Sequence, residues 1–170
     1  GKTTIANLLM GLLNVTSGEI TFLNKEINEF VKKDRKKFRK NIQMIFQSPF
    51  GSLNPRKTIG SILSLPINIH FKNTKDKTKE KVLELLTMVE LVPPEIFFDR
   101  HPHELSGGEQ QRVAIARAIS TEPKLIISDE AVASLDTSIR VDILNLLKRI
   151  NKKTKVSLIM ISHDLSVLKN

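Results

Sequence analysis

The sequence predicts an α/β fold with a parallel sheet. The main observation is that three apolar segments, residues 42–47, 124–130 and 156–162, have the length and composition of buried strands. Between these segments, apolar residues recur at the spacing of a helix, and strands that alternate with helices are typical of a parallel sheet. The chain has 170 residues, 40% of them hydrophobic and 26% charged, which is the size and composition of one globular domain spanning residues 1–170.

Charge and cysteine content narrow the function only slightly. The formal net charge of +9 fits a partner nucleic acid, an anionic lipid or simply a basic surface. The absence of cysteine excludes disulfides and thiolate metal sites. No apolar run in the sequence is long enough to span a membrane. The first residue, Gly1, falls inside a motif, so we expect the chain to be a fragment.

The first expected element is a helix that begins at a phosphate-binding motif. Gly1-Lys2-Thr3-Thr4 precedes apolar residues at helical spacing, namely Ile5, Leu8, Leu9 and Leu12. The motif resembles the end of the P-loop pattern G-x-x-x-x-G-K-[ST], in which backbone N–H groups and the lysine hold phosphates and the hydroxyl binds Mg²⁺. The first glycine and four loop residues of that pattern do not precede Gly1. We therefore expect this fragment by itself to bind ATP weakly and to be inactive.

Residues 18–41 are expected to form two short strands and a basic helix. Alternation around a turn in residues 18–27 predicts the antiparallel strands. Residues 32–40 are the densest basic run, and the favoured interpretation is a solvated helix face. A patch for acidic lipid headgroups or a partner protein is the alternative. Nucleic acid is less favoured, because the chain has no Trp or Tyr to stack on bases.

The strand at 42–47 carries Gln47 at its end, and the character of the chain then changes. Prolines and glycines punctuate residues 48–66, which predicts turns and short helices. An amphipathic helix is expected over residues 78–91, with Pro93-Pro94 ending it; its apolar face is Val82, Leu85, Leu86 and Val89. We expect segment 48–104 to be helical and to carry no chemistry of its own.

The segment around which the chain is organised is Leu105-Ser106-Gly107-Gly108-Glu109-Gln110-Gln111-Arg112, at the start of an alanine-rich helix. Ser106 is a good N-cap, and Glu109 completes a capping box. The two glycines leave backbone N–H groups open to a phosphate at the positive end of the helix. The strand at 124–130 then ends in two carboxylates, Asp129 and Glu130, which by themselves would also fit a metal hydrolase.

One more helix and one more strand complete the pattern. Asp136 precedes a helical stripe formed by Ile139, Ile143, Leu146, Leu147 and Ile150. The strand at 156–162 ends at His163. A lone histidine at a strand end is usually structural, so the sequence position alone does not make His163 functional.

The pattern L-S-G-G-x-Q-x-R ahead of a strand that ends in Asp-Glu resembles the signature motif and Walker B of ABC-type ATPases. Residues 131–136 resemble their D-loop, although Ala131 replaces a proline and Ala133-Ser134 inverts the usual order. The resemblance implies a P-loop NTPase (RecA-like) core with a parallel sheet, a small antiparallel β part and an inserted helical subdomain, truncated at both ends. The core would comprise residues 1–47 and 105–170 of this partial ABC ATPase domain, and the helical subdomain residues 48–104.

The resemblance also assigns roles to residues. Glu130 would act as the general base or orient the attacking water, and Gln47 and His163 would sense the γ-phosphate and the water. Mg²⁺ would be bound by Thr3, Asp129 and Gln47. The residues expected to bind ATP are Gly1, Lys2, Thr3 and Thr4 in one chain, and Ser106, Gly107, Gly108, Gln110 and Asp136 across a head-to-tail dimer.

Three further stretches are similar to oligopeptide/dipeptide importer ATPases: residues 46–56 (F-Q-S-P-F-G-S-L-N-P-R, with Ser48 for the usual Asp), 101–104 and 136–140. This implies an ATP-binding and ATP-hydrolysing subunit on the cytoplasmic face of the cell membrane. Its partners would be transmembrane permease subunits, a second ABC ATPase subunit and, indirectly, a solute-binding protein, with no nucleic acid.

Four alternatives stay open at this point. One is an importer ATPase for another solute, such as nickel or glutathione, and another is a soluble, non-transport ABC ATPase. A third, a DNA-associated ATPase of the SMC type, is disfavoured because no sustained heptads separate Lys2 from Leu105. The fourth, a non-catalytic remnant, is disfavoured because Lys2, Asp129, Glu130 and His163 are all present.

Overall fold

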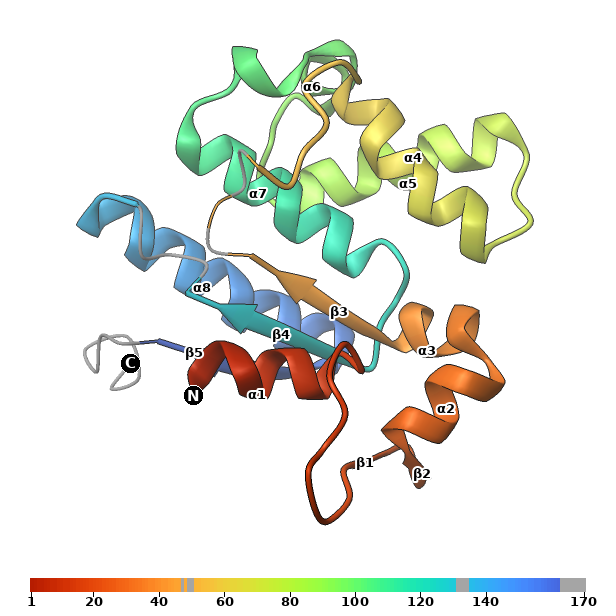
Figure 1. Ribbon diagram of the computed structural model, residues 1–170. Coiled ribbons are helices and arrows are strands. Elements are labelled where there is room, and N and C mark those ends of the chain that lie inside the picture. Colours follow the sequence, from red (N-terminus) through yellow and green to blue (C-terminus); the bar gives the residue numbers. More distant parts are fainter. Residues whose placement is uncertain (47, 49–50, 131–134, 163–170) are drawn as a thin grey trace.

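A three-stranded parallel sheet forms the centre of the computed structural model, which describes residues 1–46, 48, 51–130 and 135–162. The strands are β3 (Ile42–Ile45), β4 (Leu125–Asp129) and β5 (Ser157–Ile161), with β4 in the middle. Ile42 pairs with Leu125, and Leu125 pairs with Ser157, so the carboxyl ends of all three strands lie at one edge. This confirms the α/β class and the parallel sheet (Figure 1).

One face of the sheet packs against α1 (Lys2–Leu9), and α2 (Ile27–Lys33) and α3 (Arg35–Asn41) lie next to the amino end of β3. Their buried side chains pack on alternate residues of the strands; the cluster contains Ala6, Met10, Ile27, Phe30, Phe38, Ile42, Met44, Leu125 and Ile127. Lys32, Lys33, Arg35, Lys36 and Lys37 are exposed, which agrees with the solvated basic face expected for residues 32–40, whereas Arg39 and Lys40 are half-buried.

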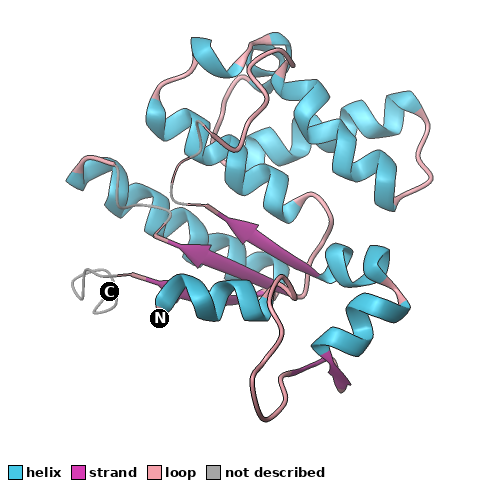
Figure 2. Cartoon of the chain, viewed as in Figure 1, coloured by secondary structure: helices cyan, strands magenta, loops and turns pink. Residues whose placement is uncertain are grey.

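The other face of the sheet carries the long helices. Ile45 and Ile126 point to this side, where they join the buried residues of α7 (Gly107–Ile119) and α8 (Thr137–Thr154). Beyond α7 lie α4 (Ile59–His70), α5 (Lys75–Met88), α6 (Pro94–Asp99) and the 3₁₀ turn η1 (Pro102–Glu104). These helices form a layer of their own next to α7 (Figure 2).

The expected hairpin is present as β1 (Thr21–Phe22) and β2 (Lys25–Glu26), which pair antiparallel. The two residues between them, Leu23 and Asn24, both have positive φ, of 54° and 58°. Two positive φ values in a two-residue loop are the geometry of a tight hairpin turn that matches the twist of the strands. Among the described residues, no helix is long and apolar enough to cross a membrane.

Two helix ends differ from the expectation. Helix α1 ends at Leu9, before Leu12, and the chain then turns at Gly11; its buried residue is Ala6, whereas Ile5 and Leu12 are each 54% exposed. Helix α5 ends at Met88, where Glu90 adopts a φ of +63°, and not at the two prolines. Gly60 lies inside α4, where a Cβ would come within 2.6 Å of the Phe98 ring, so the glycine allows α4 and α6 to approach closely.

Candidate active site

The first turn of α1 presents polar groups at the carboxyl edge of the sheet. Gly1 is the N-cap of α1, and Lys2, Thr3 and Thr4 occupy the first helical positions with exposed side chains. No side chain caps this helix and no acidic residue lies in its first turn. The unpaired N–H groups and the positive end of the helix are therefore open to an anion.

The end of β4 brings two carboxylates to this turn. Asp129 is only 9% exposed. Burial raises the pKa of its carboxyl, and the neighbouring Glu130 carboxylate raises it further, whereas a hydrogen bond from the Thr3 side chain and the charge of Lys2 oppose the shift. The structure therefore places Lys2, Thr3, Asp129 and Glu130 together, although more than one hundred residues separate the two pairs in the sequence.

Glu130 has an unusual backbone conformation directly after the strand. Its φ is +49°, a left-handed value that is uncommon for a residue other than glycine. The conformation is stabilised from the neighbouring strand, because the N–H of Glu130 donates to the carbonyl of Ile161 at 2.9 Å. Strained backbone of this kind concentrates at functional sites, and here it fixes the direction in which the chain leaves β4.

The oxygen groups at this edge fit a magnesium ion. Mg²⁺ prefers oxygen ligands and is commonly bound by one or two carboxylates together with waters and substrate phosphates. The Thr3 hydroxyl and the Asp129 carboxylate provide such oxygens, and the raised pKa of Asp129 reflects a buried negative charge that a cation would relieve. Within the described ranges there is no cluster of three or more His, Cys, Asp or Glu that could hold a metal.

The start of α7 has the expected capping box. Ser106 Oγ accepts from Glu109 N–H at 3.3 Å, and Glu109 Oε2 accepts from Ser106 N–H at 2.8 Å. Gly107 is exposed, whereas Gly108 is buried against α8, where a Cβ would lie 3.0 Å from Ile139 Cγ2. Gly107 thus leaves the first turn open, while Gly108 allows α7 and α8 to approach closely.

Gln110 has a different role from the nucleotide contact expected of it. Its side chain is 6% exposed, and its Nε2 donates to the carbonyls of Pro102 at 3.0 Å and Leu105 at 3.1 Å. Both amide hydrogens therefore hold the segment that precedes α7. Sequence reasoning also missed Gln111, a fully buried amide with no hydrogen-bond partner among the described residues.

The structure does not bring the two expected phosphate contacts together within one chain. Lys2 and Thr3 begin a helix on one face of the sheet, and Gly107 begins a helix on the opposite face. Asp136 is the N-cap residue of α8, where its carbonyl accepts from Arg140 N–H at 2.8 Å. Gln47, His163 and residues 131–134 of the expected D-loop lie outside the described residues, so their roles stay predictions.

Comparison with known proteins decides the family. The sequence model described as "ABC transporter" matches residues 1–133 of this chain. The chain belongs to the ABC transporter family. With the parallel sheet and the helix at the phosphate-binding motif, this family assignment confirms the expected P-loop NTPase fold.

Relatives within the ABC transporter family are transport ATP-binding proteins. The chain is 46% identical over its whole length to the oligopeptide transport ATP-binding protein AppF of Bacillus subtilis, and equally identical to OppF of Haemophilus influenzae. It spans about half, 51%, of the length of each of these relatives.

Solved ABC structures have the same fold. The ATP-binding cassette MJ0796, a dimer in a post-hydrolysis state bound to ADP and Pi, superposes with a TM-score of 0.83 at 32% identity, covering 98% of this chain and 72% of that one. CbiO1 of Clostridium perfringens, part of the ABC transporter complex cbiONQ, gives a TM-score of 0.87 at 31% identity, covering 99% of this chain and 64% of that one.

Proposed function

We propose that this chain binds and hydrolyses ATP as part of the ATPase subunit of an ABC importer for oligopeptides or dipeptides. The observation that carries the proposal is the convergence of Lys2 and Thr3 with Asp129 and Glu130 at the carboxyl edge of the sheet. A cation, a hydroxyl and two carboxylates beside an open helix N-terminus match what phosphoryl transfer from a magnesium nucleotide requires.

Each residue at this edge has a chemical task. Lys2 and the N–H groups of α1 neutralise charge on the β- and γ-phosphates, and Thr3 and Asp129 hold Mg²⁺, Asp129 directly or through a water. Mg²⁺, when bound there, would supply positive charge that stabilises the developing negative charge on the phosphates. Glu130 accepts the proton of the attacking water or orients it. We assign Gln47 to the metal and water, and His163 to the γ-phosphate.

A second ATPase subunit completes the site. The N-termini of α1 and α7 belong to opposite faces of the sheet, so one nucleotide does not reach both within one chain. In a head-to-tail dimer, Ser106, Gly107 and Gly108 of one subunit cover the nucleotide held by Lys2 of the other. The dimeric state of the ATP-binding cassette MJ0796, which is 32% identical, supports this arrangement.

The permeases would dock on a cavity of about 550 Å³ between α4 and the edge of the sheet. Its lining includes Leu65 and Ile69, which are large apolar side chains that are 62% and 48% exposed. Exposed apolar side chains beside a hollow favour a protein partner. This surface would place the subunit at the cytoplasmic face of the membrane, where the permeases select the solute together with a solute-binding protein.

The hydrolytic role is tested with Glu130→Gln in the full-length gene product that contains this chain. We expect ATP turnover to fall by at least about 100-fold, the contribution typical of a general base, while an ATP-bound dimer still forms. Steady-state phosphate release and size-exclusion chromatography with ATP measure the two effects. Glu80→Gln, an exposed site on α5, is the control and should leave both unchanged. Normal turnover in Glu130→Gln would remove Glu130 from its role.

The solute is tested separately by uptake in cells that lack the gene. Restoring the gene should restore uptake of a labelled tripeptide, and unlabelled dipeptides and tripeptides should compete with it. Uptake of Ni²⁺ or glutathione that returns while tripeptide uptake does not would reject the peptide assignment and leave the ATPase assignment intact.

A further inference from the structure

Glu90, just after α5, has a backbone conformation that favours glycine. Its φ is +63°. The N–H of Glu90 donates to the carbonyl of Thr87, and the N–H of Leu91 donates to that of Leu86, each at 2.9 Å. This is a Schellman motif, in which the residue at the place of Glu90 is usually glycine. A glutamate here carries a conformational cost that glycine avoids, so its side chain needs an explanation.

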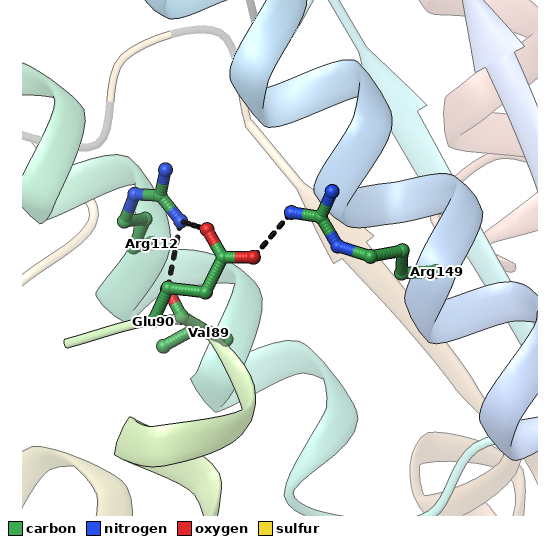
Figure 3. Close-up of polar contacts among 4 residues, drawn as sticks. All are labelled: Val89, Glu90, Arg112 and Arg149. Atoms are coloured by element: carbon green, nitrogen blue, oxygen red, sulfur yellow. Dashed lines mark hydrogen bonds and ion pairs between the residues drawn. The ribbon is translucent and has the colours of Figure 1, made fainter. Parts of the chain in front are cut away.

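The carboxylate of Glu90 joins three helices (Figure 3). Its Oε2 accepts from Arg112 Nη1 of α7 at 2.8 Å, and its Oε1 accepts from Arg149 Nη2 of α8. The same Nη1 of Arg112 also donates to the carbonyl of Val89, at the end of α5, at 2.9 Å. Arg112 is thereby held by a charged and a neutral acceptor, and its side chain is only 17% exposed.

Arg112 is the last residue of the segment Leu105–Arg112 and lies about one and a half turns from the start of α7. Because a helix is rigid over so short a distance, a side chain held at Arg112 also fixes the direction of the first turn. Arg149 gives the carboxylate a second anchor on α8, the helix against which Gly108 packs through Ile139. The contact therefore sets how α7 lies between the helical layer and the rest of the core.

We propose that Glu90 is a positioning residue for the nucleotide contact made across the dimer. Its carboxylate, acting through Arg112 and Arg149, holds α7 in the orientation in which Ser106, Gly107 and Gly108 meet the nucleotide of the other subunit. This role rests on the proposed function, since it concerns the dimer in which that nucleotide is shared.

The chain offers a matched control at the other end of α7. Glu122 follows that helix, also has a left-handed φ, of +54°, and also forms an ion pair, with Lys81 of α5. Glu90→Gly and Glu122→Gly therefore remove the same side chain from the same backbone conformation. In both variants glycine relieves the backbone, which offsets the lost ion pairs, so neither variant is expected to lower the melting temperature.

The experiment uses full-length protein that also carries Glu130→Gln, so that ATP-bound dimers accumulate. Light scattering gives the ATP concentration at which half of the protein is dimeric, and a fluorescent ATP analogue gives the affinity of the monomer. We expect Glu90→Gly to raise the half-dimer ATP concentration by about 2- to 30-fold with no change in monomer affinity. Arg149→Gln should have a smaller effect, because the Glu90 carboxylate still pairs with Arg112 in that variant. Glu122→Gly should have no effect.

The outcomes separate this inference from the proposed function. Equal half-dimer concentrations in Glu90→Gly and Glu122→Gly, or a parallel loss of monomer affinity and melting temperature in Glu90→Gly, would overturn the positioning role alone. A parent protein that binds ATP but never dimerises would overturn the shared site and the positioning role with it. Faster hydrogen exchange at the Gly107 and Gly108 amides of Glu90→Gly, but not of Glu122→Gly, is the expected signature in the monomer.

Discussion

The first turns of α1 and α7 are both expected to face phosphate, yet they are built differently. The turn of α1 has no side-chain cap, no acidic residue and a lysine at its first position. The turn of α7 has the capping box of Ser106 and Glu109 and carries the negative charge of Glu109. In the proposed dimer, the open, positive end of α1 would hold the nucleotide of its own subunit, whereas the capped end of α7 would contact the nucleotide of the other subunit.

The largest effect that tests this difference is expected from Lys2→Ala. It removes the charge at the open end, so ATP binding and turnover of the full-length protein should both fall, turnover by at least about 100-fold. Lys75→Ala is a matched control, because Lys75 also occupies the first position of a helix, α5. Isothermal titration and phosphate release measure the two effects. If Lys2→Ala bound ATP as the parent does, the open end of α1 would not be the phosphate site.

A smaller effect separates the two glycines of the capped end. A Cβ at Gly108 would lie 3.0 Å from Ile139 Cγ2, closer than ordinary contact, whereas at Gly107 the nearest atom would be Leu135 Cδ2 at 3.8 Å. Gly108→Ala should therefore lower the free energy of unfolding by about 1 kcal/mol relative to Gly107→Ala, as measured by urea denaturation. Gly107→Ala should keep its stability and weaken only the ATP-dependent dimer. The reverse order of stabilities would contradict this assignment of the two glycines.

The features that the sequence predicted well depend on neighbours in the chain. The capping box needs only Ser106 and Glu109, and the hairpin turn needs only Leu23 and Asn24. The parallel sheet followed from three apolar segments and the helices between them. The pairing of Lys2 and Thr3 with Asp129 and Glu130 is not local, and it was predicted because both groups belong to motifs of one family.

The features that the sequence did not reveal depend on distant partners. Gln110 was expected at the nucleotide, but the carbonyls of Pro102 and Leu105 that hold its amide are visible only once the preceding segment is folded. Glu90 lies 22 residues from Arg112 and 59 from Arg149 along the chain, so no local pattern indicates their contact. Likewise, the helical spacing of Ile5, Leu8, Leu9 and Leu12 does not reveal the buried residue of α1, and only the packing of α1 on β4 shows that it is Ala6.

The smallest expected effect extends the comparison to a third helix end, the C-terminus of α4. The helix dipole there would favour a protonated His70, but burial, followed by the charges of Lys36 and Lys40 on α3, lowers the pKa of its imidazole. As the pH falls, His70 is protonated in the unfolded chain before it is protonated in the folded protein, because its pKa is lower in the folded protein. The stability that the neutral His70 contributes is therefore fully present above about pH 6.5 and is lost as the pH falls through the lowered pKa. The stability advantage of the parent over His70→Asn should therefore shrink between pH 7.5 and pH 5.5.

Melting temperatures of the parent, His70→Asn and the control His103→Asn, an exposed site, measure this difference at the two pH values. The difference between the control and the parent should change less with pH than that of His70→Asn, because burial and the charges of Lys36 and Lys40 lower the pKa of His70. A parent that gained stability over His70→Asn on acidification would show that the dipole of α4 outweighs its surroundings. The expected result would instead show that neighbouring side chains outweigh the helix dipole in setting the local charge at the end of α4. Side chains also set the local charge at the other two helix ends, where Lys2 adds a positive charge to α1 and Glu109 adds a negative charge to α7.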